Sequence, residues 1–576
     1  MDLWEFSHLN NVGLTLTETA KHVPGSVAVA APLKQQRSAV ERVKRLYSKK
    51  SGASQSDTPA EFETVTFFEL EKMSNRFAVA LRAGGVQPGD RIGLMVPPGI
   101  EFVALVFALF KTGAVQILID PGMGRDNLVK CLSDTKPVGI VGSRKAHSAR
   151  LAYRKWFPDA KKNFVVGGGF PRCKKLTSSG PSDFEPATTT PDDEAAIIFT
   201  TGSTGPPKGV LYRHQTFIQQ AAWIRDWFHV QPGGADISGF PLFALFNTAM
   251  GTSTVFPDMD PTRPADIWPP NFIHAAEKFS ADQSFGSPAL WNTVSLYCEK
   301  HNIKLDTIKR VFTAGAPVPP NVLARTKSVI ADDGEVHTPY GATESLPVAC
   351  ISGREVLEET ADQSATGAGT CVGWKFPEID WRLIEITDEP LRSIDSTVEV
   401  QQGEIGELIV RGPVVTDQYV TQTNANLHHK IADGDTFWHR MGDVGYFDDR
   451  GRFWFCGRKS HRLLTESGTL FTVPCESIFN SHKKVYRCAL VPAGKPGAQV
   501  PVVFVELLPE QKTDNAAFLK RIESELLELA GKHWQTNQIR FFSVVDSLPV
   551  DIRHNSKIFR EKLRSRANSI VDPKPL

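Results

Sequence analysis

The sequence lacks several features that define whole classes of protein. Neither sign of charge prevails, because 65 Lys and Arg residues nearly balance 64 Asp and Glu residues. A nucleic-acid partner is therefore not expected, since such partners attract basic surfaces. No uninterrupted apolar run approaches the roughly 20 residues that span a bilayer, so we expect no transmembrane segment. The first residues show no basic segment followed by an apolar one, so a secretory signal is not expected.

Paired cysteines are also missing. The eight cysteines are scattered along the chain and none forms a C-x-x-C pair. In a large chain this pattern is typical of reduced, structural thiols rather than of a disulfide framework or a zinc site. Together with the missing signal, it favours a cytoplasmic enzyme.

The length and the order of the apolar segments predict an α/β protein with more than one domain. A chain of 576 residues exceeds the size at which a single core keeps growing. The pattern predicts a helix at Glu69 to Ala83, a strand at Arg91 to Val96, a helix at Glu101 to Thr112 and a strand at Val115 to Ile119. This alternation with short Gly/Pro connections is typical of a domain built on parallel strands. The first 60 residues are expected to be irregular, with a solvated basic stretch at 42–50.

The pattern of apolar segments changes toward the end of the chain. We expect a strand within Gly403 to Pro413 and a hairpin over Gly445 to Cys456 that turns at residues 448–451. Beyond Gly457 the composition indicates a small α+β unit with two strands and one helix. We therefore predict a large N-terminal domain at 1–457 and a small, mobile C-terminal domain at 458–576.

The strongest local signal is the segment from Phe199 to Gly209. It follows an apolar strand and combines three glycines, four hydroxyl residues and Lys208 in one short loop. Glycines let a backbone approach phosphate closely, while amides, hydroxyls and a lysine supply donors and positive charge. The order of residues does not fit the Walker P-loop. A phosphate-binding loop of another kind is predicted.

This segment resembles the phosphate loop of the adenylate-forming superfamily, which includes acyl-CoA synthetases, luciferases and peptide-synthetase adenylation domains. Further motifs similar to those of the family follow in the family order, and the resemblance covers nearly the whole chain. They are Val311 to Pro317, Thr338 to Glu344, Gly403 to Gly412, Trp438 to Tyr446, Gly457-Arg458 and Asp551 to Arg560.

The resemblance implies ATP and Mg²⁺ as cofactors and a role for each matched residue. Glu344 and Thr204 are expected to hold the metal, Asp443 and Arg458 the ribose, and Lys557 is the expected catalytic lysine. The remaining nucleotide-binding residues implied by the family motifs are Thr200, Thr201, Gly202, Ser203, Gly205, Lys208, Gly315, Ala316, Pro317, Tyr340, Gly341 and Thr343. The activity implied is attack of a carboxylate on ATP to give an acyl-adenylate and pyrophosphate.

The chain departs from the ordinary acyl-CoA synthetase pattern where the small domain begins. Family members have Gly-Arg-x-Asp-Asp there, whereas this sequence has Ser460 and His461 in place of the two acids, and Gly468 is displaced by one residue. Ala244 stands where many members have histidine. The segments 208–214, 257–264, 457–462 and 551–555 resemble instead the OleC-type β-lactone synthetases of bacterial long-chain olefin biosynthesis.

That second resemblance implies a long-chain 2-alkyl-3-hydroxy acid as substrate, whose own hydroxyl attacks the adenylate to close a β-lactone. His554 is a candidate catalytic base, although a packing role is also open. A long-chain acyl-CoA or acyl-carrier-protein ligase is the alternative, and a binding protein without activity is disfavoured by the retained site residues. The apolar stretches 241–250 and 267–273 fit either an alkyl tunnel or ordinary core. The olefin pathway suggests a decarboxylase and a dehydrogenase as assembly partners.

Overall fold

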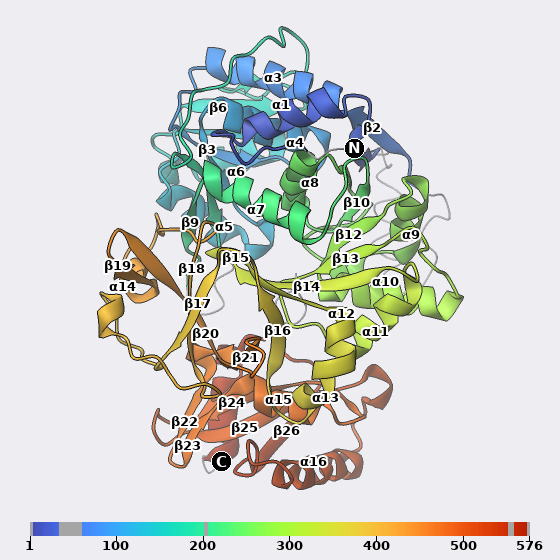
Figure 1. Cartoon of the computed structure of the whole chain (residues 1–576), viewed down its shortest axis with the longest axis vertical. Helices are drawn as coiled ribbons and strands as arrows, with labels where there is room; N and C mark the ends of the chain where they lie inside the picture. Colours follow the sequence, from blue (N-terminus) through green and yellow to red (C-terminus); the bar gives the residue numbers. More distant parts are fainter. Residues whose placement is uncertain (1–3, 34–59, 201–205, 551–557, 573–576) are drawn as a thin grey trace. The chain divides into compact units, whose positions relative to one another are not determined.

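The computed structural model describes residues 4–33, 60–200, 206–550 and 558–572 (Figure 1). The chain divides into two compact units. Unit one comprises Met1–Thr201, Pro207–Thr313 and Arg325–Gly334, and unit two comprises Gly202–Pro206, Ala314–Ala324 and Glu335–Leu576. The boundary predicted at residues 457 and 458 falls inside unit two and stays a prediction.

One sheet of unit one contains the predicted strand–helix–strand segment. Helix α3 (Phe67–Ala83), strand β3 (Arg91–Met95), helix α4 (Ile100–Lys111) and strand β4 (Val115–Leu118) confirm the prediction within one or two residues. The strand order is β7-β6-β5-β3-β4-β8-β9, and all neighbours are parallel except β8 and β9. The other strands are β5 (Gly139–Ser143), β6 (Lys162–Val166), β7 (Lys174–Lys175), β8 (Glu194–Phe199) and β9 (Gly209–Arg213).

A second set of strands in unit one runs in the order β13-β12-β10-β11-β1-β2. The pairs are parallel from β13 to β1, and β2 is antiparallel to β1. The strands are β1 (Val27–Pro32), β2 (Phe62–Thr66), β10 (Ala235–Ser238), β11 (Ser253–Val255), β12 (Gln283–Gly286) and β13 (Arg310–Thr313). The longer helices between the strands of unit one are α5 (Arg125–Asp134), α6 (Arg144–Ala152), α7 (His214–Trp227), α9 (Pro269–Lys278) and α10 (Pro288–His301).

The expectation that the first 60 residues are irregular is wrong for the part that the structure describes. Helix α1 (Gly13–His22) and strand β1 lie there. Threonine has a low helix propensity, and the three threonines of α1 obscure its apolar pattern. The buried hydroxyls of Thr15 and Thr19 bond to backbone carbonyls of Val12 (2.8 Å) and Thr15 (2.9 Å), which makes these positions compatible with a buried helix face. The basic stretch at 42–50 lies outside the described residues.

Helices α3 and α4 are joined by a fully buried lysine. The ammonium group of Lys111 donates to the side-chain oxygens of Glu71 (2.6 Å), Ser74 (2.9 Å) and Asn75 (2.7 Å). Burial lowers the pKa of Lys111, and the Glu71 carboxylate acts against that shift. A buried cation is tolerated here because three acceptors surround it.

His214 has a structural role in unit one. It is completely buried, and its Nδ1 accepts a hydrogen bond from the backbone N–H of Val12 (3.1 Å). Burial lowers the pKa of His214 to about 4, and the carboxylate of Asp193 acts in the opposite direction. The imidazole is therefore neutral in the folded chain at neutral pH.

This shift predicts a pH-dependent stability. Between about pH 6.5 and pH 4 the unfolded chain binds a proton at His214 and the folded chain does not, so stability falls as the pH is lowered. The free energy of unfolding of the wild type is expected to lose about 3 kcal/mol relative to a His214→Asn variant over this range. Urea titrations of both proteins at several pH values measure the difference. A constant difference would contradict the assignment.

The apolar stretch from 241 to 250 forms packed core. It contains helix α8 (Ala244–Met250), of which Ala244, Leu245 and Met250 are buried. The ring of Phe243 stacks on that of Phe285 at 4.3 Å between centroids. Core packing therefore accounts for these residues, and an alkyl tunnel beside them stays a prediction.

Unit two contains a largely antiparallel set of strands in the order β14-β15-β16-β21-β20-β18-β17. The strands are β14 (Glu335–Ala342), β15 (Ser345–Ser352), β16 (Thr370–Lys375), β17 (Asp380–Ile384), β18 (Gly406–Arg411), β20 (Thr436–Phe447) and β21 (Phe453–Arg458), with β19 (Lys430–Asp433) paired to β20. The predicted hairpin is confirmed, because Asp448 in the turn between β20 and β21 accepts hydrogen bonds from the backbone N–H groups of Arg450 (3.0 Å) and Arg452 (2.9 Å).

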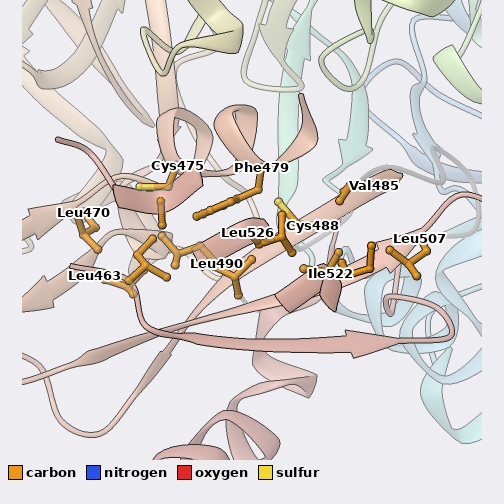
Figure 2. Packing of buried hydrophobic residues seen from close by; sticks show 14 residues of the cluster. Leu463, Leu470, Cys475, Phe479, Val485, Cys488, Leu490, Leu507, Ile522 and Leu526 are labelled. Carbon is orange, nitrogen blue, oxygen red and sulfur yellow. The ribbon is translucent and has the colours of Figure 1, made fainter. Parts of the chain in front are cut away.

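The last part of unit two has its own apolar core. Strands β24 (Val485–Ala493), β25 (Val500–Leu507) and β26 (Phe541–Val545) form a sheet that packs with helices α15 (Thr472–Asn480) and α16 (Ala516–Gly531). Figure 2 shows the side chains that meet there, among them Phe479 from α15, Leu490 from β24 and Ile522 from α16. A hairpin of β22 (Leu463–Thr465) and β23 (Gly468–Leu470) precedes them, and α17 (Arg564–Val571) follows. The two strands and the helix predicted for this region are confirmed.

All eight cysteines are free thiols, and seven of them are buried. Among the described residues, no helix combines the length and apolar character needed to cross a membrane.

Candidate active site

The phosphate-loop motif connects two strands of unit one. β8 and β9 form an antiparallel pair in which Phe199 lies opposite Gly209. Just beyond them, the Thr200 N–H donates to the Lys208 carbonyl (3.0 Å), and the Lys208 N–H donates to the Thr200 hydroxyl (3.1 Å). These bonds close the base of the loop. Its central residues, Thr201, Gly202, Ser203, Thr204 and Gly205, lie outside the described residues.

The motif from Val311 to Pro317 consists of the end of β13 and the irregular loop that follows it. Gly315 has a φ of +95°, a conformation that other residues rarely adopt. Ala316 and Pro317 continue the loop before helix α11 (Pro320–Val329).

Tyr340, Asp443 and Arg458, which come from three of the family motifs, meet in unit two. Asp443 on β20 lies directly opposite Arg458 on β21, and their side chains form an ion pair of 2.9 Å between Nη1 and Oδ1. The Tyr340 hydroxyl on β14 donates to the other carboxylate oxygen of Asp443. Arg458 also donates to the Met441 carbonyl at 3.0 Å. The β20–β21 hairpin and strand β14, about 100 residues earlier, thus bring together a ring, a carboxylate and a guanidinium.

Burial has the largest effect on the pKa values of Asp443 and Tyr340. It raises the pKa of Asp443, while Arg458 and the Tyr340 hydroxyl act in the opposite direction. Burial and the Asp443 carboxylate raise the pKa of Tyr340 well above its ordinary value, so the phenol remains a donor. The pKa of Arg458 is raised by Asp443. A carboxylate held beside a permanent cation is a strong acceptor for the hydroxyl groups of a ligand.

Glu344 lies in the turn between β14 and β15, and a segment 72 to 75 residues later holds it. The hydroxyl of Tyr419 donates to Glu344 Oε1 at 2.6 Å. The Thr416 N–H and hydroxyl both donate to the Glu344 carbonyl, at 2.9 and 3.0 Å. Burial and the Glu344 carboxylate raise the pKa of Tyr419, so it remains a donor. Sequence reasoning missed Tyr419 and Thr416, because no spacing rule connects them to Glu344.

The turn that presents Glu344 depends on a glycine. Gly341 lies beside an irregularity in the β14–β15 pairing, and a Cβ at this position would come within 2.6 Å of the Ser345 carbonyl oxygen. Thr343, the last motif residue before Glu344, is half-buried. Any larger residue at position 341 therefore displaces the backbone on which Glu344 is placed.

The described residues contain no group of three or more acidic, histidine or cysteine side chains that forms a metal site. Glu344 is a single buried carboxylate. This donor set fits a magnesium ion that is bound mainly by phosphates and water with one or two protein carboxylates. Glu344 is the residue that would hold the ion, and the ion would neutralise phosphate charge.

The segment after Arg458 makes contacts that the sequence did not predict. The Lys459 ammonium donates to Glu407 Oε2 (3.0 Å) and to the Thr387 carbonyl (2.8 Å). Glu407 is itself completely buried and paired with Arg440. Arg462 pairs with Asp388 at 2.7 Å. The segment from Lys459 to Arg462, called the altered junction below because it departs from the family pattern, therefore has ionic partners of its own within unit two.

The two remaining candidates, His554 and Lys557, lie outside the described residues. Their roles stay predictions.

Comparison with known proteins decides the family. The family model described as AMP-binding enzyme matches residues 46–420. The chain belongs to the AMP-binding enzyme family. The adenylate-forming relationship expected from the motifs is therefore confirmed, and with it the use of ATP that is general to the family.

Two relatives of this AMP-binding enzyme are olefin β-lactone synthetases. The protein from Xanthomonas campestris pv. campestris is 40% identical over 565 residues, which cover 96% of this chain and 97% of the relative. The protein from Stenotrophomonas maltophilia is 43% identical over 519 residues, which cover 88% of this chain and 92% of the relative. The resemblance expected from the sequence is thus confirmed. By contrast, a long-chain fatty-acid CoA ligase from Mycobacterium tuberculosis is 25% identical over 424 residues.

Solved structures confirm the α/β fold of this AMP-binding enzyme. An anthranilate CoA ligase in complex with anthranoyl-AMP superposes with a TM-score of 0.75 at 19% identity, covering 98% of both chains. The amide bond synthetase from Marinactinospora thermotolerans superposes with a TM-score of 0.74 at 18% identity, covering 96% of this chain and 99% of the other.

Proposed function

We propose that this enzyme activates a long-chain 2-alkyl-3-hydroxy acid with ATP and closes it to a β-lactone. The observation that supports this most strongly is the 40–43% identity to olefin β-lactone synthetases over most of the chain. The grouping of Tyr340, Asp443 and Arg458 in unit two supports the nucleotide half of the proposal.

In the first step the substrate carboxylate attacks the α-phosphorus of ATP. A P–O bond forms to the carboxylate, and the bond to pyrophosphate breaks. Both reactants are anions, so the site must orient them and offset their charge. Asp443 and Arg458 bind the ribose hydroxyls, Glu344 holds Mg²⁺, and the Lys557 ammonium donates to the oxygens on which charge develops.

In the second step the 3-hydroxyl of the substrate attacks the activated carbonyl. A C–O bond forms, the hydroxyl proton passes to a base, and the bond between the carbonyl carbon and AMP breaks with AMP leaving as an anion. His554 is the candidate base, since imidazole titrates near neutral pH. The nucleophile belongs to the substrate and is therefore held close to the activated carbonyl. This proximity lowers the activation free energy by several kcal/mol.

The departures after Arg458 support this second step over transfer to a thiol. Ser460 and His461 replace the paired acids. Gly468 is the first residue of β23, directly after the turn of the β22–β23 hairpin. The glycine loop that lies along pantetheine in CoA ligases is therefore altered. The alternative remains a long-chain acyl-CoA or acyl-carrier-protein ligase. The same proposal includes three further points. The enzyme is cytoplasmic, residues 458–576 form a separate domain, and a decarboxylase and a dehydrogenase are its assembly partners.

Product analysis tests the proposal. Purified enzyme is incubated with ATP, Mg²⁺ and a long-chain 3-hydroxy acid branched at C2, with and without CoA, and the acyl product is identified by mass spectrometry. We expect equal yields of β-lactone in both reactions. A thioester that forms only with CoA would instead establish the acyl-CoA ligase.

A further inference from the structure

The chain on both sides of residues 551–557 is closely held. Val550 and Ile558 form an antiparallel bridge, and the Phe559 N–H donates to the Pro549 carbonyl at 2.8 Å. On the N-terminal side, the Leu548 N–H donates to Glu506 Oε2 at 3.0 Å. The described residues that flank this segment therefore form a fixed stem.

A buried ion pair holds the C-terminal side of the stem. Arg560 donates through Nη2 to both carboxylate oxygens of Glu476 on α15, at 2.6 and 2.7 Å. Glu476 Oε1 also accepts the Leu490 N–H of β24 at 2.7 Å. Both side chains are largely buried, with exposed fractions of 13% for Arg560 and 11% for Glu476. A charge pair with little solvent has few alternative geometries, because separating it leaves two buried ions.

The same arginine contacts the altered junction. Arg560 Nη1 lies 3.5 Å from Nδ1 of His461, the residue that replaces the second family acid. A guanidinium can only donate, so the imidazole nitrogen is the acceptor in this contact. His461, α15 and the chain after residue 557 are thereby connected through one side chain.

We propose that Arg560, Glu476 and His461 are positioning residues for adenylate formation. They fix Ile558 to Arg560, the stretch immediately after Lys557, and so determine where the lysine ammonium is presented. This rests on the proposed function, because it requires Lys557 to act on the reacting phosphate. A displacement of about 1 Å of a reacting group lowers a rate about 100-fold, so the stem is expected to matter for rate.

The test is Arg560→Lys, which keeps the charge and removes the fork that spans Glu476 and His461. We expect the kcat of hydroxy-acid-dependent ATP–pyrophosphate exchange to fall about 10- to 100-fold with the KM for ATP unchanged. Conversion of separately supplied acyl-adenylate to lactone does not use Lys557 and should fall by a smaller factor than exchange, since only His554 of the same segment takes part in it. His461→Ala should lower the exchange rate in the same way by a smaller factor.

A matched control separates positioning from general stability. Arg452 is also largely buried, with 5% of its side chain exposed, and pairs with Asp448 at 2.8 Å and Glu359 at 2.7 Å within unit two. Arg452→Lys is expected to lower the melting temperature and leave the exchange rate near that of the wild type. If Arg560→Lys exchanges at the wild-type rate, or loses exchange and lactone closure equally, the positioning role is overturned. Absence of exchange in the wild type itself would overturn the proposed function and this assignment with it.

Discussion

Replacing Lys557 with alanine is expected to slow adenylate formation about 100- to 1,000-fold, the usual effect of removing one group that stabilises transition-state charge. The negative charge that develops around the α-phosphorus then lacks its ammonium partner. Binding of ATP should change little, because Asp443 and Arg458 hold the ribose in the proposed site. Closure of supplied acyl-adenylate to lactone should continue, since that step uses a base rather than an ammonium.

Exchange between ATP and labelled pyrophosphate, with the hydroxy acid present, measures the first step alone. Conversion of chemically prepared acyl-adenylate measures the second. A Lys557→Ala enzyme that exchanges at the full rate would remove the lysine from the mechanism. Replacement of Lys562, a nearby lysine outside the matched motif, serves as the control and should have no effect.

Replacing Asp443 with asparagine is expected to raise the KM for ATP about 10- to 100-fold, because hydrogen bonds to a charged group contribute about 1.5–3 kcal/mol each. Asparagine retains one acceptor for the Tyr340 hydroxyl but removes the charge that pairs with Arg458. The ribose hydroxyls then lose their anionic acceptor. The kcat at saturating ATP should fall less than the affinity does.

Steady-state kinetics over a wide ATP range separate these two parameters. Asp448→Asn is the control, because Asp448 is a partly buried acid, with 18% of its side chain exposed, that also pairs with an arginine on the β20–β21 hairpin. It should leave the KM for ATP unchanged. If both variants raise the KM equally, Asp443 acts through the hairpin and not through the ribose.

The sequence predicted those parts of the fold that depend on local pattern. Helix α4, strands β3 and β4 and the Asp448 turn all follow from periodicity and turn chemistry, and each was found within one or two residues. Helix α1 was missed because buried threonines occupy part of its inner face, so the sequence shows no continuous apolar stripe. Their hydroxyls donate to backbone carbonyls, which allows these polar side chains to be buried.

In the candidate site, too, some residues could be predicted from the sequence and others could not. Tyr340, Glu344, Asp443 and Arg458 lie in motifs, so the resemblance identified them. Tyr419, which donates to Glu344, and the pairing of Arg560 with Glu476 were not predicted, because both contacts join residues 75 or more positions apart. Such contacts arise from tertiary packing, and one sequence gives no signal for them.

Oxygen labelling tests the central claim, that the carboxylate is activated as an adenylate and then attacked by the hydroxyl of the same molecule. The hydroxy acid is prepared with both carboxylate oxygens as ¹⁸O, and AMP and lactone are analysed by mass spectrometry. The account predicts one ¹⁸O in AMP and one in the lactone carbonyl, with the unlabelled hydroxyl oxygen in the ring. Unlabelled AMP with both ¹⁸O atoms in the lactone would contradict it, because the hydroxyl rather than the carboxylate would then have been activated.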